Sequence, residues 1–244
     1  LLIIMLTKKI YGLIGRNINY SFSKKYFTQK FKNDKIDNCE YLNFDIDKIS
    51  DFKKINLNNI NGFNVTIPYK EKIIGYLDEI EESAKNIGAV NTIKILKNKL
   101  IGYNTDYLGF INSFNKKLDY KNVLILGSGG ASKAIQYAIK TKKINFDVAS
   151  RKSDVNHIAY TQIESLEKYD LIVNCTPLGT YPNVNDKPDL NYDQLNDKHL
   201  CYDLIYNPSE TLFLNESKKR GARILNGLQM LKLQAEESWK IWNS

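Results

Sequence analysis

The sequence predicts an α/β protein of two domains, each built on a mostly parallel sheet with helices on its faces. Apolar, strand-like segments alternate with helical segments along the 244 residues, and a glycine-rich turn joins a strand to a helix at 121–140. The hydrophobic content of 43% is enough for a core. We place the domain boundary at Thr105–Asp106. The first domain is then expected over 1–105, completed by a C-terminal helix over 228–244, and the second over 106–227.

Each expected element follows from its own pattern. Alternating or continuous apolar runs bounded by glycine or polar residues predict strands, and apolar residues at helical spacing predict helices. Strands are expected at 8–15, 40–46, 60–67, 122–126, 145–150, 170–175, 199–204 and 222–225. Two more, at 91–96 and 99–104, form a hairpin that turns at Lys97–Lys99. Helices are expected at 21–31, 69–77, 107–114, after the glycine turn, and at the C-terminus.

The C-terminal helix has one apolar face, and a glutamine lies within it. The apolar positions are Leu228, Leu231, Ala235, Trp239 and Trp242. Gln234 falls on this face between Leu231 and Ser238, and a buried glutamine must find hydrogen-bond partners. Two explanations are open from the spacing alone: an interdomain hydrogen bond or a contact with a ligand.

Composition narrows the function classes. The net charge is +8, but the lysines are scattered rather than grouped with aromatic residues, so we interpret them as solvated helix ends and turns. The three cysteines, at 39, 175 and 201, form no C-x-x-C pair, which indicates a reducing compartment without a zinc site. With only two histidines we expect no metal.

No segment approaches the ~20 apolar residues of a membrane span. The opening "LLIIML" lacks the features of a signal peptide, and we expect it to be an upstream extension. We therefore expect a cytoplasmic protein that binds neither membrane nor nucleic acid, as a monomer or homodimer.

The glycine turn "VLILGSGGASKA" predicts a dinucleotide site of the Rossmann type. Gly127 permits the tight turn, Gly129 lets the backbone approach a pyrophosphate, and the following helix N-terminus offers N–H groups and positive potential. Gly130 and Ala134 allow close packing of the helix on the strand. A tight turn without a ligand is the alternative.

The end of the next strand bears on the choice of cofactor. An NAD site usually has an acidic residue there, whereas this strand ends in Ser150, Arg151 and Lys152. Two cations suit a 2′-phosphate, and arginine can bind it bidentately. Asp147 is expected inside the strand rather than at its tip. The pattern therefore favours NADP.

The segment "GFNVTIPYK" places Asn64, Thr66 and Lys70 on one strand and the turn that follows it. An amide, a hydroxyl and an amine in this order fit a site for a polyhydroxylated small molecule better than they fit a surface loop.

Seven segments in order resemble the shikimate dehydrogenase family, from about Tyr11 to Trp242. They are "GLIGRNINYSFS", "NVTIPYK", "GAVNTI", "GYNTDYLGF", "NCTPLG", "DLIYNPSET" and "GLQMLKLQA". The chain departs from the family at Tyr20, where histidine is usual, and at Lys24, where proline is usual. The family's N-R-T cofactor motif reads Ser150-Arg151-Lys152 here.

The resemblance implies reversible reduction of 3-dehydroshikimate to shikimate by NADPH, a step of chorismate and aromatic amino acid biosynthesis, in a cleft between the domains. It implies that Lys70 and Asp106 are catalytic, with Lys70 transferring the proton and Asp106 holding the amine. The implied substrate residues are Ser21, Ser23, Asn64, Thr66, Asn91, Tyr206 and Gln234. The implied cofactor residues are Gly127, Ser128, Gly129, Gly130, Ala131, Ser150, Arg151, Lys152, Thr176 and Gly227.

Alternatives stay open at this point. Asn64 as a turn residue and Tyr206 as a packing residue are two of them. A quinate/shikimate dehydrogenase that uses NAD is a rival enzyme, and a non-catalytic NADP-binding regulatory module is a rival of another class. A basic nucleic-acid binder, with salt-sensitive binding, is a third.

Overall fold

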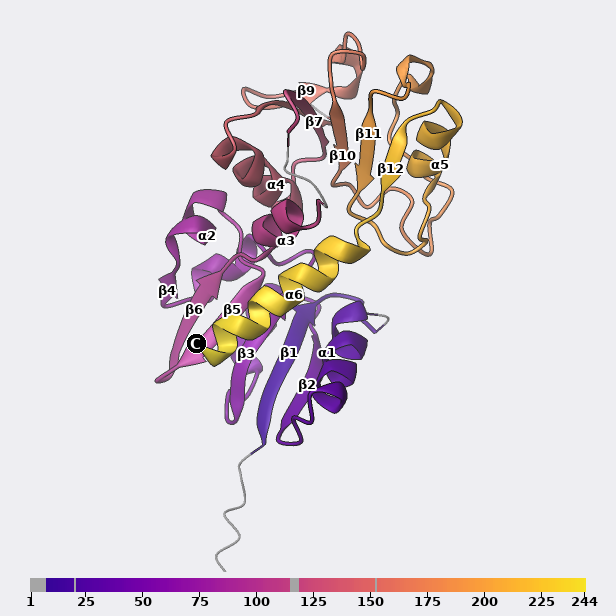
Figure 1. Ribbon diagram of the computed structural model, residues 1–244. Helices are drawn as coiled ribbons and strands as arrows, with labels where there is room; N and C mark the ends of the chain where they lie inside the picture. The colour runs from indigo at the N-terminus through magenta and orange to yellow at the C-terminus, as the bar shows by residue number, and fades with distance from the viewer. Residues whose placement is uncertain (1–7, 20, 115–118, 152) are drawn as a thin grey trace, which may run out of the picture. The chain divides into compact units, whose positions relative to one another are not determined.

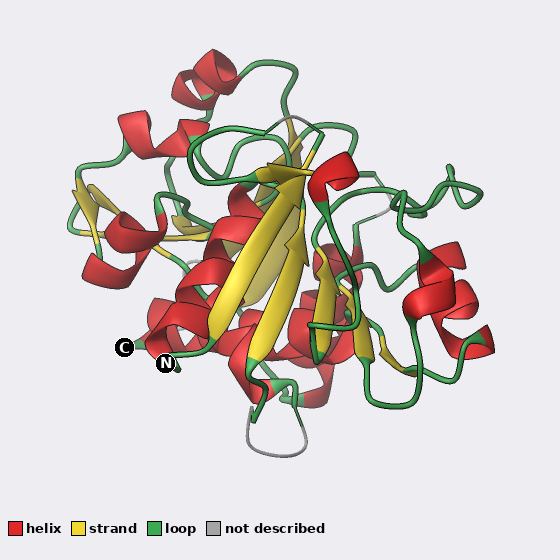
Figure 2. Cartoon of the chain, turned by 90° about the horizontal axis from the view of Figure 1, so that it is seen from above, coloured by secondary structure: helices red, strands yellow, loops and turns green. Residues whose placement is uncertain are grey.

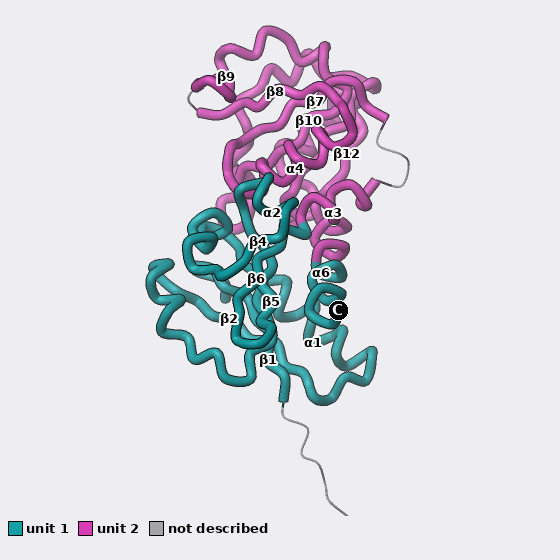
Figure 3. The backbone as a smooth tube through the Cα atoms, turned by 90° about the vertical axis from the view of Figure 1, so that its left-hand side faces the viewer, with its two compact units in different colours: residues 1–105, 235–244 teal, residues 106–234 magenta. Residues whose placement is uncertain are grey.

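The structure is a computed structural model that describes residues 8–19, 21–114, 119–151 and 153–244 (Figure 1). The chain divides into two compact units, Leu1–Thr105 with Ala235–Ser244 (unit 1) and Asp106–Gln234 (unit 2), coloured separately in Figure 3. Within the terminal helix the division falls at Ala235, not at Leu228 where we expected it. The reason is packing, because Met230 joins a core cluster of unit 2 and Ala235 joins one of unit 1.

Unit 1 contains a six-stranded mixed sheet in the order β2-β1-β3-β5-β6-β4. Its elements are β1 (Lys9–Gly15), α1 (Phe22–Asn33), β2 (Cys39–Asp45), η1 (Ile49–Lys54), β3 (Ile60–Val65), η2 (Lys72–Tyr76), β4 (Glu79–Ile80), α2 (Glu82–Ile87), β5 (Thr92–Leu96) and β6 (Lys99–Tyr103). Strand β1 is parallel to β2 and β3, while β5 is antiparallel to both β3 and β6. Gly15 pairs with Asp45, and Ile14 with Val65, so the carboxyl ends of β1, β2 and β3 meet at one edge.

Successive side chains of a strand point to opposite sides of a sheet, and in this sheet both sides are covered. On one face Phe63 and Ile93 pack with Phe52 of η1 and Ile73 of η2. On the other face an aromatic cluster joins α1 and the end of the terminal helix α6 (Leu228–Asn243) to the strands. Its buried members are Tyr11, Leu13, Ile18, Phe27, Phe31, Tyr41, Ala235 and Trp242.

The predicted hairpin is confirmed, with β5 and β6 joined through Lys97 and Asn98, both at positive φ. The helix predicted at 69–77 is wrong in kind. Only the short 3₁₀ helix η2 forms there, with i→i+3 bonds such as Leu77 N to Ile74 O. Gly75 weakens a longer helix, and the chain must extend again to form β4.

Unit 2 has a six-stranded sheet in the order β12-β11-β10-β7-β8-β9, and all its strand pairs are parallel. Its elements are α3 (Asp106–Asn112), β7 (Asn122–Leu126), α4 (Gly130–Thr141), β8 (Asn145–Ser150), β9 (Ile158–Ala159), η3 (Tyr160–Gln162), β10 (Leu171–Asn174), η4 (Tyr192–Gln194), β11 (Leu200–Asp203), α5 (Leu212–Lys219), β12 (Arg223–Leu225) and the first turns of α6. The chain starts in the middle at β7, runs outward through β8 and β9, then returns to β10 on the other side. This is the order of the Rossmann fold, and its switch point lies between β7 and β10.

Helices lie on both faces of the unit 2 sheet, and Figure 2 shows the helices in red around the yellow strands. Ile125 and Val173 face Ile135 of α4 and Phe110 of α3 in one cluster. Leu124 and Ile172 face Phe213 of α5 in the other. The two-sided burial explains why these strands read as continuous apolar runs.

We expect Trp242→Phe to lower the free energy of unfolding by about 2–3 kcal/mol, from the lost ring volume and the orphaned carbonyl. Trp242 is buried, stacks on Tyr11, and donates its indole N–H to Ile93 O at 2.9 Å. Urea unfolding followed by circular dichroism measures the change. The matched control is Trp239→Phe, half-buried in the same cluster, for which we expect under about 1 kcal/mol. Equal losses would contradict the role of the Trp242 hydrogen bond.

Candidate functional site

The segment that carries Thr66 and Lys70 is a turn at the carboxyl end of β3. Thr66 N donates to Ile14 O at 2.9 Å, and Lys70 O accepts from Val90 N at 2.8 Å. The buried Tyr69 between them donates its hydroxyl to Ile46 O at 2.7 Å. The turn is therefore fixed at both ends, and the half-buried Thr66 and Lys70 side chains extend from a rigid backbone.

The loop between β1 and α1, which leads to the two serines, is held by one carboxylate at the end of β2. Asp45 accepts hydrogen bonds from Asn17 N at 2.8 Å and Ile18 N at 3.0 Å. Ser21 is the N-cap of α1, where its side chain accepts from Ser23 N at 3.2 Å. Serine is a favoured N-cap, so Ser21 also has a local role in starting the helix. The neighbouring Tyr20 lies outside the described residues.

The Asn64 side chain makes hydrogen bonds within unit 1. It lies within β3 and is buried, so the alternative of a turn residue is wrong. Its Oδ1 accepts from the Tyr41 hydroxyl at 2.8 Å, and its Nδ2 donates to Ser238 Oγ at 2.9 Å. The amide thereby joins two strands to the terminal helix, and the Tyr41 phenol also interacts with the Ser23 hydroxyl.

Ser238 continues this network toward Asn91. Its Oγ lies 2.7 Å from Thr92 Oγ1 and 3.2 Å from Thr105 Oγ1. Asn91 Oδ1 accepts from Thr105 N at 2.7 Å, and Asn91 Nδ2 donates to Thr105 Oγ1 at 2.9 Å. All these residues are buried, so the network is a rigid polar core.

Four members of this network were missed from the sequence: Tyr41, Thr92, Thr105 and Ser238. Thr105 stands inside the motif "GYNTDYLGF", and Ser238 lies one helical turn after Gln234, so both were within reach of a pattern argument. Nothing in the sequence marks Tyr41.

Asp106 and Gln234 belong to unit 2, whereas Lys70 belongs to unit 1. Asp106 directly follows Thr105, begins α3 and is buried. Gln234 is buried too, and its Nε2 donates to Leu231 O at 2.8 Å, which is a bond within the helix.

The glycine turn has the geometry of an anion site. Gly127 follows β7 with φ of 103°, and its N–H donates to Ala149 O at 2.7 Å. Gly129 is the N-cap of α4 and offers no side-chain cap to the first helical N–H groups. A Cβ at Gly129 would meet nothing within 4 Å. The uncapped N-terminus and the open space in front of it fit a pyrophosphate.

The register of β8 is as expected. Asp147 lies inside the strand, accepts the Tyr169 hydroxyl at 2.6 Å, and pairs with Lys168 at 3.3 Å. Ser150 is the last residue of the strand, and the exposed Arg151 follows it. Lys152 lies outside the described residues. The described residues at the strand tip, Ser150 and Arg151, therefore include no acidic side chain.

Gly227 and Tyr206 lie on neighbouring loops at the carboxyl ends of β12 and β11. A Cβ at Gly227 would lie 2.0 Å from Leu204 O, so only glycine fits. Gly227 N donates to Ile205 O at 3.0 Å, next to the half-buried Tyr206. Thr176 follows β10, close to the glycine turn, because a Cβ at Gly127 would lie 3.1 Å from its Cγ2.

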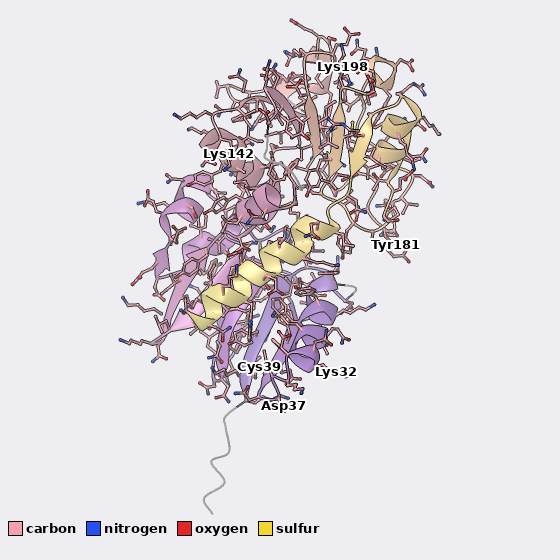
Figure 4. The ribbon with its side chains drawn as sticks, in the orientation of Figure 1. Lys32, Asp37, Cys39, Lys142, Tyr181 and Lys198 are labelled. Atoms are coloured by element: carbon pink, nitrogen blue, oxygen red, sulfur yellow. The ribbon has the colours of Figure 1, made fainter. Side chains whose placement is uncertain are left out.

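The described part of the chain holds no cluster of three or more metal-binding side chains. None of its helices combines the length and apolar character needed to cross a membrane. Its lysines are dispersed, as with Lys32 on α1, Lys142 after α4 and Lys198 before β11 (Figure 4).

Sequence comparison supports the resemblance. A family model described as the shikimate dehydrogenase substrate binding domain matches residues 13–93. The chain is 41% identical over 246 residues to a shikimate dehydrogenase (NADP(+)) of Clostridium botulinum strain Hall, and the match covers 95% of each chain.

Structural comparison gives the same result. A crystal structure of a shikimate dehydrogenase in complex with NADP+ matches with a TM-score of 0.86 at 37% identity, covering 96% of this chain and 90% of that one. A quinate dehydrogenase of Corynebacterium glutamicum in complex with NAD matches with a TM-score of 0.83 at 26% identity, covering 97% and 94%. The fold alone therefore does not separate the two enzymes.

We expect Ser238→Ala to lower the free energy of unfolding by about 1–3 kcal/mol, because Asn64 Nδ2 and the two threonine hydroxyls lose a buried partner. Urea unfolding of the two proteins measures the difference. Ser209→Ala, at an exposed serine, is the control and should stay within about 0.5 kcal/mol. A loss no larger than that of the control would show that the network is dispensable.

Proposed function

The chain belongs to the shikimate dehydrogenase family, and from this premise we propose that it catalyses the reversible NADPH-dependent reduction of 3-dehydroshikimate to shikimate. One observation carries the proposal. The similarity extends over 95% of the chain, so the polar turn of unit 1 and the glycine turn of unit 2 belong to the same enzyme architecture. By the same inference the reaction serves chorismate and aromatic amino acid biosynthesis.

The cofactor site of this proposal is in unit 2. The pyrophosphate would lie at the uncapped N-terminus of α4, beside Gly127, Ser128, Gly129, Gly130 and Ala131. Arg151 at the strand tip, with Ser150, would bind the 2′-phosphate that distinguishes NADP from NAD. Thr176 and Gly227 would bound the site on the loops that follow β10 and β12. When bound, the nicotinamide supplies the hydride.

The proton is the protein's own contribution. In the reduction, Lys70 donates a proton to the oxygen of the former carbonyl, and in the reverse reaction it accepts the hydroxyl proton. Asp106 orients the amine and accepts a hydrogen bond from a ring hydroxyl. Anchoring of Lys70 O by Val90 N fixes the backbone from which the amine reaches the substrate.

The remaining polar residues would bind the ring. Ser21 and Ser23 suit the carboxylate, while Thr66, Asn91 and Gln234 suit hydroxyl groups, with Tyr206 beside the nicotinamide. Asn64 supports the proposal differently, because its amide is engaged by Tyr41 and Ser238. We propose that it positions Thr66 and Asn91 rather than binding substrate as its main role.

We propose a cytoplasmic location from the cysteines, all three of which are free thiols. The partners of this proposal are the small-molecule substrate and NADP.

Lys70→Ala should lower kcat for shikimate oxidation by about 10²–10⁴-fold, because general acid–base help is lost. Absorbance at 340 nm with shikimate and NADP+ measures the rate. Lys72→Ala, an exposed lysine two residues further on, is the matched control and should retain wild-type kcat.

Three other results would redirect the assignment. Equal rates for Lys70→Ala and wild type would remove Lys70 from the chemistry. Faster turnover of quinate with NAD+ would identify the rival enzyme. Tight NADP+ binding without turnover of any substrate pair would favour a regulatory module.

Arg151→Ser should raise KM for NADP+ by about 10–100-fold while leaving KM for NAD+ nearly unchanged, because a charge-assisted contact is worth about 1.5–3 kcal/mol. Arg151 is exposed, so the fold should be unaffected. Initial rates with each cofactor measure the change, with Lys142→Ser as the control cation. If both cofactors weaken alike, Arg151 does not recognise the 2′-phosphate.

A further inference from the structure

Asp203 is a buried carboxylate at the carboxyl end of β11, and the mechanism above does not use it. Its Oδ1 accepts from Asn174 Nδ2 at 3.1 Å and from Ile205 N at 3.0 Å. Its Oδ2 accepts from the Thr211 hydroxyl at 2.6 Å. Three donors from three separate segments of unit 2 thus converge on one side chain.

The first of these donors, Asn174, connects Asp203 to the loop after β10, which we propose to border the cofactor. Asn174, the last residue of β10, is fully buried. Its Nδ2 is committed to Asp203, so its Oδ1 points to the following loop and accepts from Thr176 N at 3.0 Å and Thr176 Oγ1 at 2.7 Å. Thr176 lies beside Gly127 at the switch point of the sheet. Asp203 therefore sets the orientation of the amide that holds this loop.

The second and third donors lead to the loop after β11. Ile205 N is bound to the carboxylate, and Ile205 O in turn accepts from Gly227 N. Thr211, which caps α5, closes the other end of the loop that contains Tyr206. One carboxylate thereby ties together the loops that follow β10 and β11 and, through Ile205, the start of α6.

The surroundings of Asp203 are neutral at physiological pH. Burial raises its pKa to about 6, against the opposing effect of its three hydrogen bonds. The Cys175 thiol and the Tyr192 phenol lie near enough for the charge of Asp203 to act on their pKa values. Burial raises the pKa of each above its ordinary value, so neither offers a charge. Burying a carboxylate without a cationic partner costs free energy unless hydrogen bonds to it offset that cost.

We propose that Asp203 is a positioning residue for the cofactor, holding the loops after β10 and β11 in the conformation that binds NADP. The proposal rests on the proposed function for the identity of the cofactor. Asp203 itself touches neither cofactor nor substrate in this account, and acts through Asn174 on Thr176 and through Ile205 on the loop of Tyr206.

The test is NADP+ binding by calorimetry to the full chain carrying Asp203→Ala or Asp203→Asn. Asp203→Ala should raise the dissociation constant at least about tenfold, since hydrogen bonds that fix both loops are lost. Asp203→Asn should stay within about threefold, because its oxygen can accept from Asn174 and Ile205 while its amide donates to Thr211. Amide hydrogen exchange at 175–178 in the cofactor-free protein should rise in the alanine variant only.

Ser217→Ala is the control for a merely structural effect. Ser217 is buried on α5 and donates to Phe213 O at 2.7 Å, so its loss destabilises unit 2 without touching either loop. Its NADP+ dissociation constant should equal that of wild type. If Asp203→Ala binds NADP+ like wild type, or if Asp203→Asn is as weak as Asp203→Ala, the positioning role is wrong. Wild-type protein that binds NADP+ without turnover contradicts the proposed activity only; failure to bind NADP+ overturns both.

Stability against pH gives an independent check of the buried carboxylate. Between the ordinary pKa near 3.8 and the raised pKa near 6, Asp203 binds its proton more tightly in the folded state. Its contribution to stability is therefore full below pH 3.8 and is lost as pH rises through about 6. The stability of wild type relative to Asp203→Asn should fall over this window and be constant above it. A difference that does not change with pH would contradict the raised pKa of Asp203.

Discussion

The hydrogen bond between Asn64 and Ser238 joins the middle of the unit 1 sheet to a helix 174 residues later in the chain. A buried amide must be satisfied, so this bond fixes where the terminal helix can lie against β3. Because Ser238 also contacts Thr92 and Thr105, the same helix orders the two segments that hold Asn91. The substrate side of the proposed enzyme therefore depends on the last residues of the chain as much as on the motif "NVTIPYK".

In unit 2 a buried carboxylate, rather than a buried hydroxyl, holds separate segments together. The parallel strands of this unit leave several loops at one edge of the sheet, and loops without regular pairing must find partners for their backbone groups. Asp203 accepts one hydrogen bond from a backbone group, Ile205 N, and two from the side chains of Asn174 and Thr211, while Gly227 lacks the side chain that would clash with Leu204 O. The cofactor edge is thus preorganised in part by Asp203, a residue that we do not place in contact with a ligand.

Both units separate reaction from support in the same manner. Among the residues we propose for chemistry and binding, Thr66, Lys70, Thr176 and Tyr206 stand on turns just beyond the strands. Buried amides, hydroxyls and one carboxylate hold such turns from behind. This arrangement suits a reaction in which the cofactor carries the hydride, because the protein then needs orientation and one well-placed proton donor.

The sequence by itself determined what local pattern controls. Alternating apolar runs specified the main strands, the G-x-G-G turn specified the strand-to-helix dinucleotide motif, and Ser150 with Arg151 specified the end of β8. These features depend on residues close together in the chain, whose periodicity and φ preferences act locally. The pattern failed where a longer-range demand prevailed, as at η2, where extension into β4 and Gly75 allowed only a 3₁₀ helix.

Only the tertiary structure decided which polar residues support the site. Asn174 and Asp203 begin two of the family-like segments, "NCTPLG" and "DLIYNPSET", whereas Tyr41 has ordinary surroundings in the sequence. The supporting roles of these residues and of Ser238 come from partners up to 174 residues away. It also decided that Asn64 is a buried strand residue with internal hydrogen bonds rather than a turn residue, and that the terminal helix divides between the two units at Ala235. The physical reason is that the role of a buried polar group depends on the donors and acceptors that folding brings to it from distant parts of the chain. No local sequence pattern specifies these partners.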